Sequence, residues 1–252
     1  MRIGRVAAGD EIGYAVLTQD RADLLAGPPI GELRYTGEAV PLEKVRLLAP
    51  VLPSKIVCVG KNYAAHAAEM GGEVPTEPLL FLKPSTSIVG PGDAIRYPGG
   101  VQRLDHEAEL AVVVARVCTR VSEEVAAASI LGYTCANDVS ARDYQVSDGQ
   151  WTRAKGFDTF CPLGPWIETE LDVSSVRVRA ICNGETRQDG DTADMVFKPA
   201  FLVSYISQIM TLLPGDVILT GTPDGVAPMK PGDSIEIDVA GIGTLSNPVA
   251  DF

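Results

Sequence analysis

The chain contains 252 residues, of which 46% are hydrophobic, and it carries a formal net charge of −12 at pH 7. A chain of this length and composition can bury a large core, either as one domain or as a small domain plus a larger one. The acidic balance argues against binding to a phosphate backbone, which depends on clustered lysine and arginine. We therefore expect no nucleic-acid partner.

Neither a targeting segment nor a membrane anchor is indicated. The first residues, Met1 to Val6, are too few and too polar to resemble a signal peptide, and no apolar run approaches the length of about 20 residues that spans a bilayer. The five cysteines are widely spaced and form no Cys-x-x-Cys pair, so they predict core thiols instead of a disulfide framework or a zinc site. We expect a cytoplasmic protein that does not associate with membranes.

The N-terminal part of the chain differs in pattern from the rest. Short β-like runs such as residues 12–17 alternate with turn residues, including Gly27-Pro28-Pro29. A polar, proline-bounded passage from Pro41 to Pro53 follows. We predict a small β-rich N-terminal domain over residues 1–50 and a larger catalytic domain over residues 51–252.

A histidine and a glutamate are placed together shortly after this passage. Residues 56–60 are typical of a buried strand, and residues 61–70 predict a short helix that Gly71-Gly72 ends. His66 and Glu69 are three positions apart and share a face of that helix. The carboxylate could orient and charge-stabilise the imidazole, as in an acid/base dyad. The alternative is a solvent-facing polar pair on a surface helix.

A cluster of acids lies at the entrance of an apolar run, in the stretch Asp105-His106-Glu107-Ala108-Glu109. In an extended strand Glu107 and Glu109 project to the same side and His106 to the other. Two carboxylates so close are well solvated, share a proton or bind a cation. Because the residues that follow are apolar, we favour a cation, and we assign His106 a structural role.

A third carboxylate, Asp138, is expected at the end of a strand that begins near Tyr133. Three carboxylates form an all-oxygen site that suits Mg²⁺, Mn²⁺ or Ca²⁺ better than zinc or copper. Together with a divalent ion they leave a charge of about −1, so an anionic ligand needs further positive charge. Arg142 and Lys155 are candidates for it. The alternative is a set of solvated surface acids.

The remaining chain indicates many strands and few helices. Asn183-Gly184 lies between an alternating run and a polar return and predicts a β-hairpin. Apolar residues at helical spacing predict an amphipathic helix over residues 199–213, with Pro199 near its first turn. Strands and helices do not alternate regularly, which favours an α+β fold over a doubly wound sheet.

Six short blocks make the chain similar to the fumarylacetoacetate hydrolase family, in particular to its acylpyruvate hydrolase and 2-hydroxyhepta-2,4-diene-1,7-dioate isomerase-like members. The blocks are Gly60-Lys61-Asn62-Tyr63 with His66 and Glu69, Phe81-Leu82-Lys83-Pro84, His106-Glu107-Ala108-Glu109-Leu110, Asn137 to Gln145, Lys155-Gly156-Phe157-Asp158, and Leu219 to Val226. They lie in family order between about residue 53 and residue 250. Six blocks in order are far more specific than any single motif.

The resemblance implies a mixed β-sandwich roll, usually a homodimer, that holds Mg²⁺ or Mn²⁺. By position, Glu107, Glu109 and Asp138 would be the metal ligands. Several relatives have an acidic residue where this chain has Ala65. The chain thus departs from the family pattern next to His66 and Glu69, where a charge would tune their acidity.

The resemblance also implies which groups face a small-molecule 2-oxo acid. Lys155 and Gln145 would be catalytic, and Arg142 and Thr222 would bind the substrate. His66 and Glu69 match a catalytic dyad that some members carry on a lid helix.

These features together predict a metal-dependent hydrolase that cleaves a carbon-carbon bond in an acylpyruvate-type 2,4-dioxo acid through a metal-stabilised enolate. Water activated by His66 and Glu69 would attack the distal carbonyl, while Lys155 and Gln145 stabilise the oxyanion. The same electron sink supports two alternatives, a 2-oxo-dicarboxylate decarboxylase and a 2-hydroxyhepta-2,4-diene-1,7-dioate isomerase of aromatic catabolism. A non-catalytic metal-binding member of the family is a further alternative.

Overall fold

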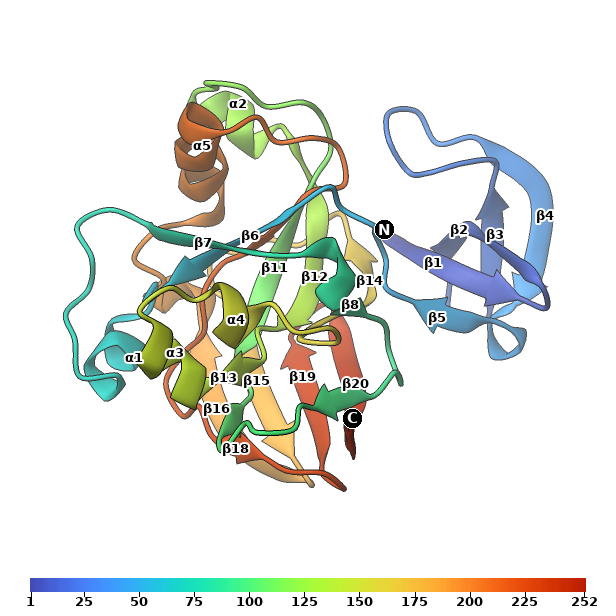
Figure 1. Ribbon diagram of the computed structural model, residues 1–252. Helices are drawn as coiled ribbons and strands as arrows, with labels where there is room; N and C mark the ends of the chain where they lie inside the picture. The colour runs from blue at the N-terminus through green and yellow to red at the C-terminus, as the bar shows by residue number, and fades with distance from the viewer.

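The computed structural model describes all 252 residues and shows many strands with five short helices (Figure 1). The helices are α1 (Ala64–Glu69), α2 (Glu123–Ala127), α3 (Arg142–Asp148), α4 (Thr152–Lys155) and α5 (Pro199–Ile209). Single 3-10 turns are formed by Leu42–Lys44, Ser85–Ser87 and Thr192–Asp194. The prediction of a β-rich chain with few helices is therefore confirmed.

One sheet of 12 strands contains both the N-terminal region and the centre of the molecule. Its strands are β1 (Arg2–Ala8), β2 (Glu11–Leu17), β3 (Arg21–Leu25), β4 (Tyr35–Pro41), β5 (Arg46–Leu48), β6 (Ile56–Gly60), β7 (Leu79–Lys83), β8 (Ile88–Val89), β11 (Ala108–Val114), β12 (Ile130–Asn137), β14 (Cys161–Glu168) and β17 (Val217–Leu219). In space the path is β4-β3-β2-β1-β14-β12-β11-β17-β6-β7, with β5 attached to β1 and β8 to β14. Within this sheet, only β6 with β17 and β8 with β14 are parallel pairs.

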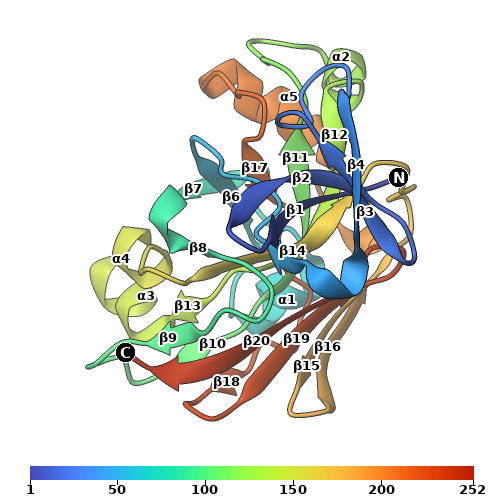
Figure 2. The same ribbon diagram turned by 90° about the vertical axis from the view of Figure 1, so that its right-hand side faces the viewer.

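A second sheet of five strands packs against the first and lies in the lower half of Figure 2. Its strands, in the order β16-β15-β19-β20-β9, are β9 (Ile95–Tyr97), β15 (Arg177–Cys182), β16 (Glu185–Asp191), β19 (Ser234–Val239) and β20 (Gly243–Asp251). Leu110 and Cys135 of the first sheet share a core of 22 buried residues with Val178 and Ile237 of the second. A third, small sheet joins β10 (Leu104–Asp105), β13 (Ser140–Ala141) and β18 (Pro228–Met229).

Strand β11 is buried along its whole length, which explains why its sequence is an unbroken apolar run. One face carries Leu110 against the second sheet and, further along, Val112 and Val114 against α2 and α5. The opposite face carries Ala111 and Val113, which join a separate core. Glu109 is the first residue of β11 on that opposite face, so its carboxylate points away from the main core between the two sheets.

The helix predictions need correction at their ends. Helix α5 begins at Pro199 as expected but ends at Ile209, because Leu212 instead pairs with Cys118 in an isolated bridge. Helix α1 begins only at Ala64, because Lys61 has a positive φ of 56° and Tyr63 is extended. The hairpin is confirmed, with Asn183 and Gly184 in the left-handed region between β15 and β16.

The first five strands form a lobe at one side of the molecule (Figure 1). Val6, Ala15, Leu17 and Ala22 pack in a small core of their own within it. The lobe joins the rest of the sheet where Arg2 and Ile3 of β1 pair with Glu168 and Ile167 of β14. The side chain of Ile3 reaches the neighbouring core of the central sheet, so the two parts share apolar packing as well as backbone pairing.

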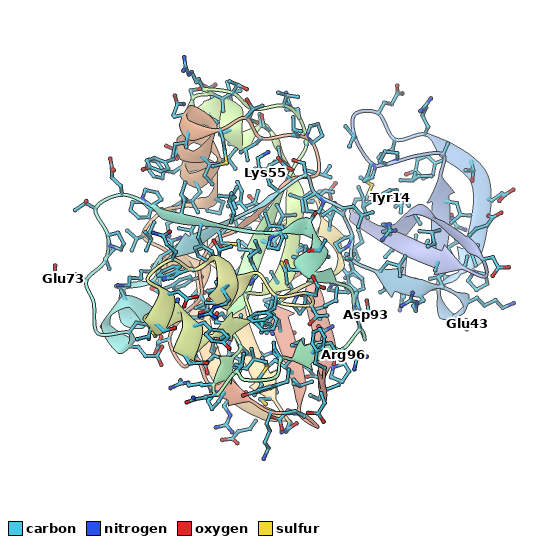
Figure 3. The ribbon with its side chains drawn as sticks, in the orientation of Figure 1. Tyr14, Glu43, Lys55, Glu73, Asp93 and Arg96 are labelled. Atoms are coloured by element: carbon cyan, nitrogen blue, oxygen red, sulfur yellow. The ribbon has the colours of Figure 1, made fainter.

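Asp216 holds the segment that connects the lobe to β6, where Lys55 is labelled in Figure 3. Its buried carboxylate accepts hydrogen bonds from the N–H and the hydroxyl of Ser54, from the N–H of Lys55 and from the N–H of Leu213. The Lys55 ammonium lies 2.5 Å from its second oxygen. Burial alone would raise the pKa of Asp216, but the hydrogen bonds from Lys55 and Ser54 hold it below the ordinary value.

Replacing Asp216 with asparagine should lower the free energy of unfolding by about 3 kcal/mol at pH 7, because it leaves the Lys55 ammonium and several donors without an anionic partner. A depressed native-state pKa gives stability above the unfolded-state pKa that is lost as the pH falls through the native value. The gap between the two proteins should therefore be full above about pH 5 and shrink below about pH 3. Urea unfolding measures it, with Asp10→Asn on an exposed turn as control. An equal gap at both pH values would contradict the assignment.

All five cysteines are free and buried, as the prediction of core thiols required. No helix combines the length and the apolar character that a membrane crossing needs.

Candidate active site

Two adjacent antiparallel strands bring the three predicted carboxylates together. Glu107 precedes β11, Glu109 is the second residue of β11, and Asp138 follows β12 directly. The register pairs Ala108 with Asn137, so the start of β11 lies beside the end of β12. Ligand oxygens of the three carboxylates lie within 4.8 Å of one another, and all three side chains are buried. They are therefore not solvated surface acids.

A cavity of about 220 Å³ opens over these carboxylates. Eight of the nine residues predicted for the site line its wall, and the ninth, Glu69, contacts His66. The wall is built by α1, α3 and α4 together with the ends of the central strands (Figure 1). Segments distant in sequence therefore meet at one concave, partly polar site.

Two buried lysines form ion pairs with Glu107 and Asp138. The ammonium nitrogen of Lys155, at the end of α4, lies 2.9 Å from Glu107 and 2.7 Å from Asp138. The ammonium nitrogen of Lys83, at the end of β7, lies 2.5 Å from the other oxygen of Asp138 and donates to the Val139 carbonyl at 3.2 Å. Lys83 was not predicted as a site residue. Its only signal was its place in the Phe81-Leu82-Lys83-Pro84 block.

The electrostatic surroundings of Glu107 and Glu109 differ. Burial alone would raise the pKa of Glu107, but the charges of Lys155 and Arg142 hold it well below the ordinary value. The pKa of Glu109 is raised well above the ordinary value, by burial first and then by the charges of Asp138 and Glu107. The N–H of Gly221 donates to Glu109 at 2.6 Å, which offsets only part of this effect. Glu109 is thus the carboxylate that an added cation would stabilise most.

The donor set fits a divalent cation that prefers oxygen. The group contains three buried carboxylates and neither histidine nor cysteine. Mg²⁺ and Mn²⁺ favour such hard oxygen ligands. Glu109 forms no ion pair within the fold, so a cation would relieve its burial among like charges. The residues present therefore fit the metal that the sequence implied.

His66 and Glu69 are joined as the helical spacing predicts. His66 Nδ1 lies 3.2 Å from one oxygen of Glu69, and the other oxygen accepts a hydrogen bond from the Gly225 N–H at 3.1 Å. His66 is buried and lines the cavity, which excludes a solvent-facing imidazole. When Nδ1 carries the proton shared with Glu69, Nε2 presents a lone pair.

Arg142, the first residue of α3, has a partner for each part of its guanidinium group. Nε donates to the buried Asp105 at 2.9 Å, one terminal nitrogen donates to Gln145 at 2.8 Å, and the other lies 2.7 Å from Glu107. Asp105 also accepts two hydrogen bonds from Arg103, so it orients Arg142 from behind. Because the Gln145 oxygen accepts from Arg142, the amide N–H groups of Gln145 are the part that can donate to a ligand.

The Thr222 hydroxyl is used within the fold. It donates to the Ala108 carbonyl at 2.8 Å and accepts from the Gln188 amide at 2.7 Å. The Gln188 oxygen binds the fully buried His106 at Nδ1, 3.0 Å away, which gives His106 the structural position that strand alternation predicted. Thr222 lines the cavity, and its contact with a substrate carboxylate stays a prediction. Gln188, on β16, had no sequence signal.

Aromatic residues and one more lysine complete the cavity wall. Phe81 and Trp151 meet edge to face with ring centroids 5.1 Å apart, and both line the cavity. Lys61, the residue after β6, also lines the wall. Neither Trp151 nor Lys61 was predicted as a site residue.

The chain belongs to the fumarylacetoacetate hydrolase family. Residues 55–250 match the family described as Fumarylacetoacetate (FAA) hydrolase C-terminal. Residues 1–50 match a second description, Rv2993c-like, N-terminal. The family resemblance seen in the six sequence blocks is therefore confirmed.

Several similar proteins match over nearly the whole chain. The solved structure of 5-carboxymethyl-2-hydroxymuconate delta-isomerase from Mycobacterium smegmatis is 50% identical, with a TM-score of 0.95 and 100% coverage of both chains. That of 2-hydroxyhepta-2,4-diene-1,7-dioate isomerase from Mycobacterium marinum is 48% identical, with a TM-score of 0.93, covering 100% of this chain and 98% of the other. A mitochondrial oxaloacetate tautomerase from Homo sapiens is 42% identical over 252 residues, which are 95% of this chain and 77% of the relative.

Proposed function

We propose that the protein is a metal-assisted enzyme that moves a proton on a 2-oxo acid, as a tautomerase or double-bond isomerase. The observation that carries this proposal is the position of His66, which is oriented by Glu69 and lines the same cavity as the three carboxylates and Lys155. The relatives named as isomerases and as a tautomerase support it. Hydrolysis, the first expectation from the sequence, becomes the second candidate.

In this proposal Glu107, Glu109 and Asp138 hold Mg²⁺ or Mn²⁺. When bound, such an ion acts as a Lewis acid toward the carbonyl and carboxylate oxygens of a 2-oxo acid. Lys155 keeps two of the ligands in place. Burial alone would lower the pKa of Lys155, but Asp138 and Glu107 raise it above the ordinary value, so the side chain stays an ammonium.

His66 holds the proton that is moved. With Nδ1–H directed to Glu69, His66 Nε2 accepts a proton from the carbon next to the substrate carbonyl. The resulting imidazolium is stabilised by the Glu69 carboxylate, which the Gly225 N–H keeps in position. The imidazolium then returns the proton to oxygen, giving the enol, or to a more distant carbon, giving the isomer.

The other predicted side chains bind and orient the substrate. Lys155 and the Gln145 amide supply donors for its oxygens, and Arg142 supplies positive charge beside Glu107. Phe81 and Trp151 form an apolar part of the wall that keeps bulk water from the reacting carbon.

Hydrolysis of an acylpyruvate is the second candidate, because one observation favours it. The dyad could deprotonate a water molecule as readily as a carbon, and the cavity of about 220 Å³ leaves room for a water molecule beside a small 2-oxo acid. Decarboxylation would use the same carboxylates but has less need of a base such as His66.

The domain arrangement belongs to the same proposal. Residues 1–50 form a small domain around the core of Val6, Ala15, Leu17 and Ala22, and residues 51–252 form the catalytic domain. The two facing sheets of the catalytic domain make up a mixed β-sandwich roll. No residue of the first 50 lines the cavity, which supports this division.

A comparison of three reactions tests the proposed function. With Mg²⁺ or Mn²⁺, the purified protein should exchange the C3 hydrogens of oxaloacetate with deuterium, or isomerise a hydroxydienedioate, faster than it releases pyruvate from an acylpyruvate. Proton NMR follows the exchange, and chelation of the metal with EDTA should abolish it. Faster pyruvate release would establish hydrolysis instead. Metal-independent turnover would refute the metal-assisted mechanism, and no turnover on any substrate would favour a non-catalytic member.

A further inference from the structure

One basic side chain on the cavity wall has no acidic partner. Lys155 is paired with Glu107 and Asp138, and Arg142 is paired with Asp105 and Glu107. Lys61 lines the same cavity but takes part in none of the salt bridges of the fold. It is therefore a cation that a ligand can reach without displacing a carboxylate of the protein.

The backbone at Lys61 indicates that its side chain is used. Its φ of 56° lies in the left-handed region, which costs free energy in a residue such as lysine. The surroundings enforce this conformation, because the next residue, Asn62, is fully buried and donates to the carbonyls of Thr220 at 2.7 Å and Phe197 at 2.9 Å. Glycine would adopt it without strain. A lysine held there points to a function of its ammonium group.

The ammonium group of Lys61 lies against the turn that follows α1. A Cβ atom added to Gly72 would be 2.6 Å from Lys61 Nζ, so the absence of a side chain at Gly72 leaves room for it. The loop beyond this turn projects from the molecule at Glu73 (Figure 3). The three metal-site carboxylates, in contrast, are buried. The cavity thus presents a buried cluster and, nearer the surface, an unpaired cation.

The charge balance of the site supports a ligand with two negative ends. Five acids lie at or beside the cavity, and four basic side chains face them, Lys83, Lys155, Arg103 and Arg142; the acids are Glu69, Asp105, Glu107, Glu109 and Asp138. A divalent ion and Lys61 then leave a formal charge of about +2, which a single carboxylate does not cancel.

We propose that Lys61 binds the distal carboxylate of a 2-oxo dicarboxylic acid and so selects dicarboxylic over monocarboxylic substrates. This inference rests on the proposed function, because it assumes that the 2-oxo end lies at the buried cluster. Lys61 is a specificity-determining residue in this account, since it contacts the end of the substrate that does not react.

Lys61→Met tests the proposal with two four-carbon acids that differ in one carboxylate, oxaloacetate and 2-oxobutyrate. The ratio of kcat/KM for deuterium exchange at C3, oxaloacetate over 2-oxobutyrate, should fall at least about tenfold, because a charge-assisted hydrogen bond to the distal carboxylate is lost. Lys61→Arg should retain most of the ratio. Lys44→Met, which removes an exposed charge in the N-terminal lobe, should leave it unchanged.

Calorimetric binding of the same two acids in the presence of Mg²⁺ provides a readout that needs no turnover. The parent should bind oxaloacetate more tightly, and Lys61→Met should lose that preference while still binding Mg²⁺. An equal loss for both acids would give Lys61 a merely structural role and overturn the proposal, as would a parent without any preference. Preferential binding without exchange or isomerisation would support the role of Lys61 and refute the proposed function alone.

Discussion

Replacing Glu109 with glutamine should weaken metal binding and lower turnover together while the fold stays intact. The amide has the same shape but no charge, and it removes one of only three anionic ligands. Affinity for Mn²⁺ should fall at least about 100-fold, and turnover should fall with it. Because burial and like charges raise the pKa of Glu109, the neutral amide should not lower the melting temperature of the metal-free protein.

Three measurements on this variant separate the possible causes. Calorimetry gives the metal affinity, the deuterium-exchange assay gives turnover, and thermal unfolding reports the fold. Glu43→Gln, a change at an exposed glutamate of the N-terminal lobe (Figure 3), is the matched control and should alter none of them. Full metal occupancy with surviving activity in Glu109→Gln would remove Glu109 from the set of ligands.

Replacing His66 with alanine should slow proton transfer by about 10²- to 10⁴-fold, the usual contribution of a general base. The imidazole lines the cavity, and its Nδ1 contacts Glu69 rather than any of the three carboxylates that would hold the metal. Affinity for Mn²⁺ should therefore stay within about threefold of the parent value. Turnover and calorimetric titration on the same preparation measure the two effects.

A second variant of the dyad separates the base from the group that orients it. Glu69→Gln should lower turnover less than His66→Ala, because it removes the orienting charge and leaves the base. Rates equal to the parent in His66→Ala would exclude His66 from the mechanism.

Sequence reasoning succeeded where local spacing determines geometry. The same-side projection of Glu107 and Glu109 follows from strand alternation, and the contact of His66 with Glu69 follows from helical spacing. Asp138 could be predicted as the third ligand because the end of its strand can be recognised from a few neighbouring residues. In each case the relevant distance is set within a few residues of one element.

The residues that sequence reasoning missed depend on contacts between distant segments. Lys83 reaches Asp138 across 55 positions, and Gln188 reaches Thr222 across 34. A lysine at a strand end and a glutamine in a hairpin carry no local sign of such partners. The end of α5 was misplaced for the same reason, since Leu212 pairs with Cys118 of a remote loop. Tertiary pairing overrode the helical periodicity there.

The parallel pairing of β6 with β17 has a consequence for how the chain folds. Lys55 directly precedes β6 and Asp216 directly precedes β17, and the hydrogen bond between them joins residues that are 161 positions apart. The centre of the sheet therefore closes only when almost the whole chain is present. Pairings of such long sequence separation form slowly, because a large loop must be ordered before any contact rewards it. The segments after β6 and β17 carry His66 and Gly225, which Glu69 connects. A nascent or truncated chain that ends before β17 would thus be inactive and would expose an unpaired strand edge, a typical starting point for aggregation.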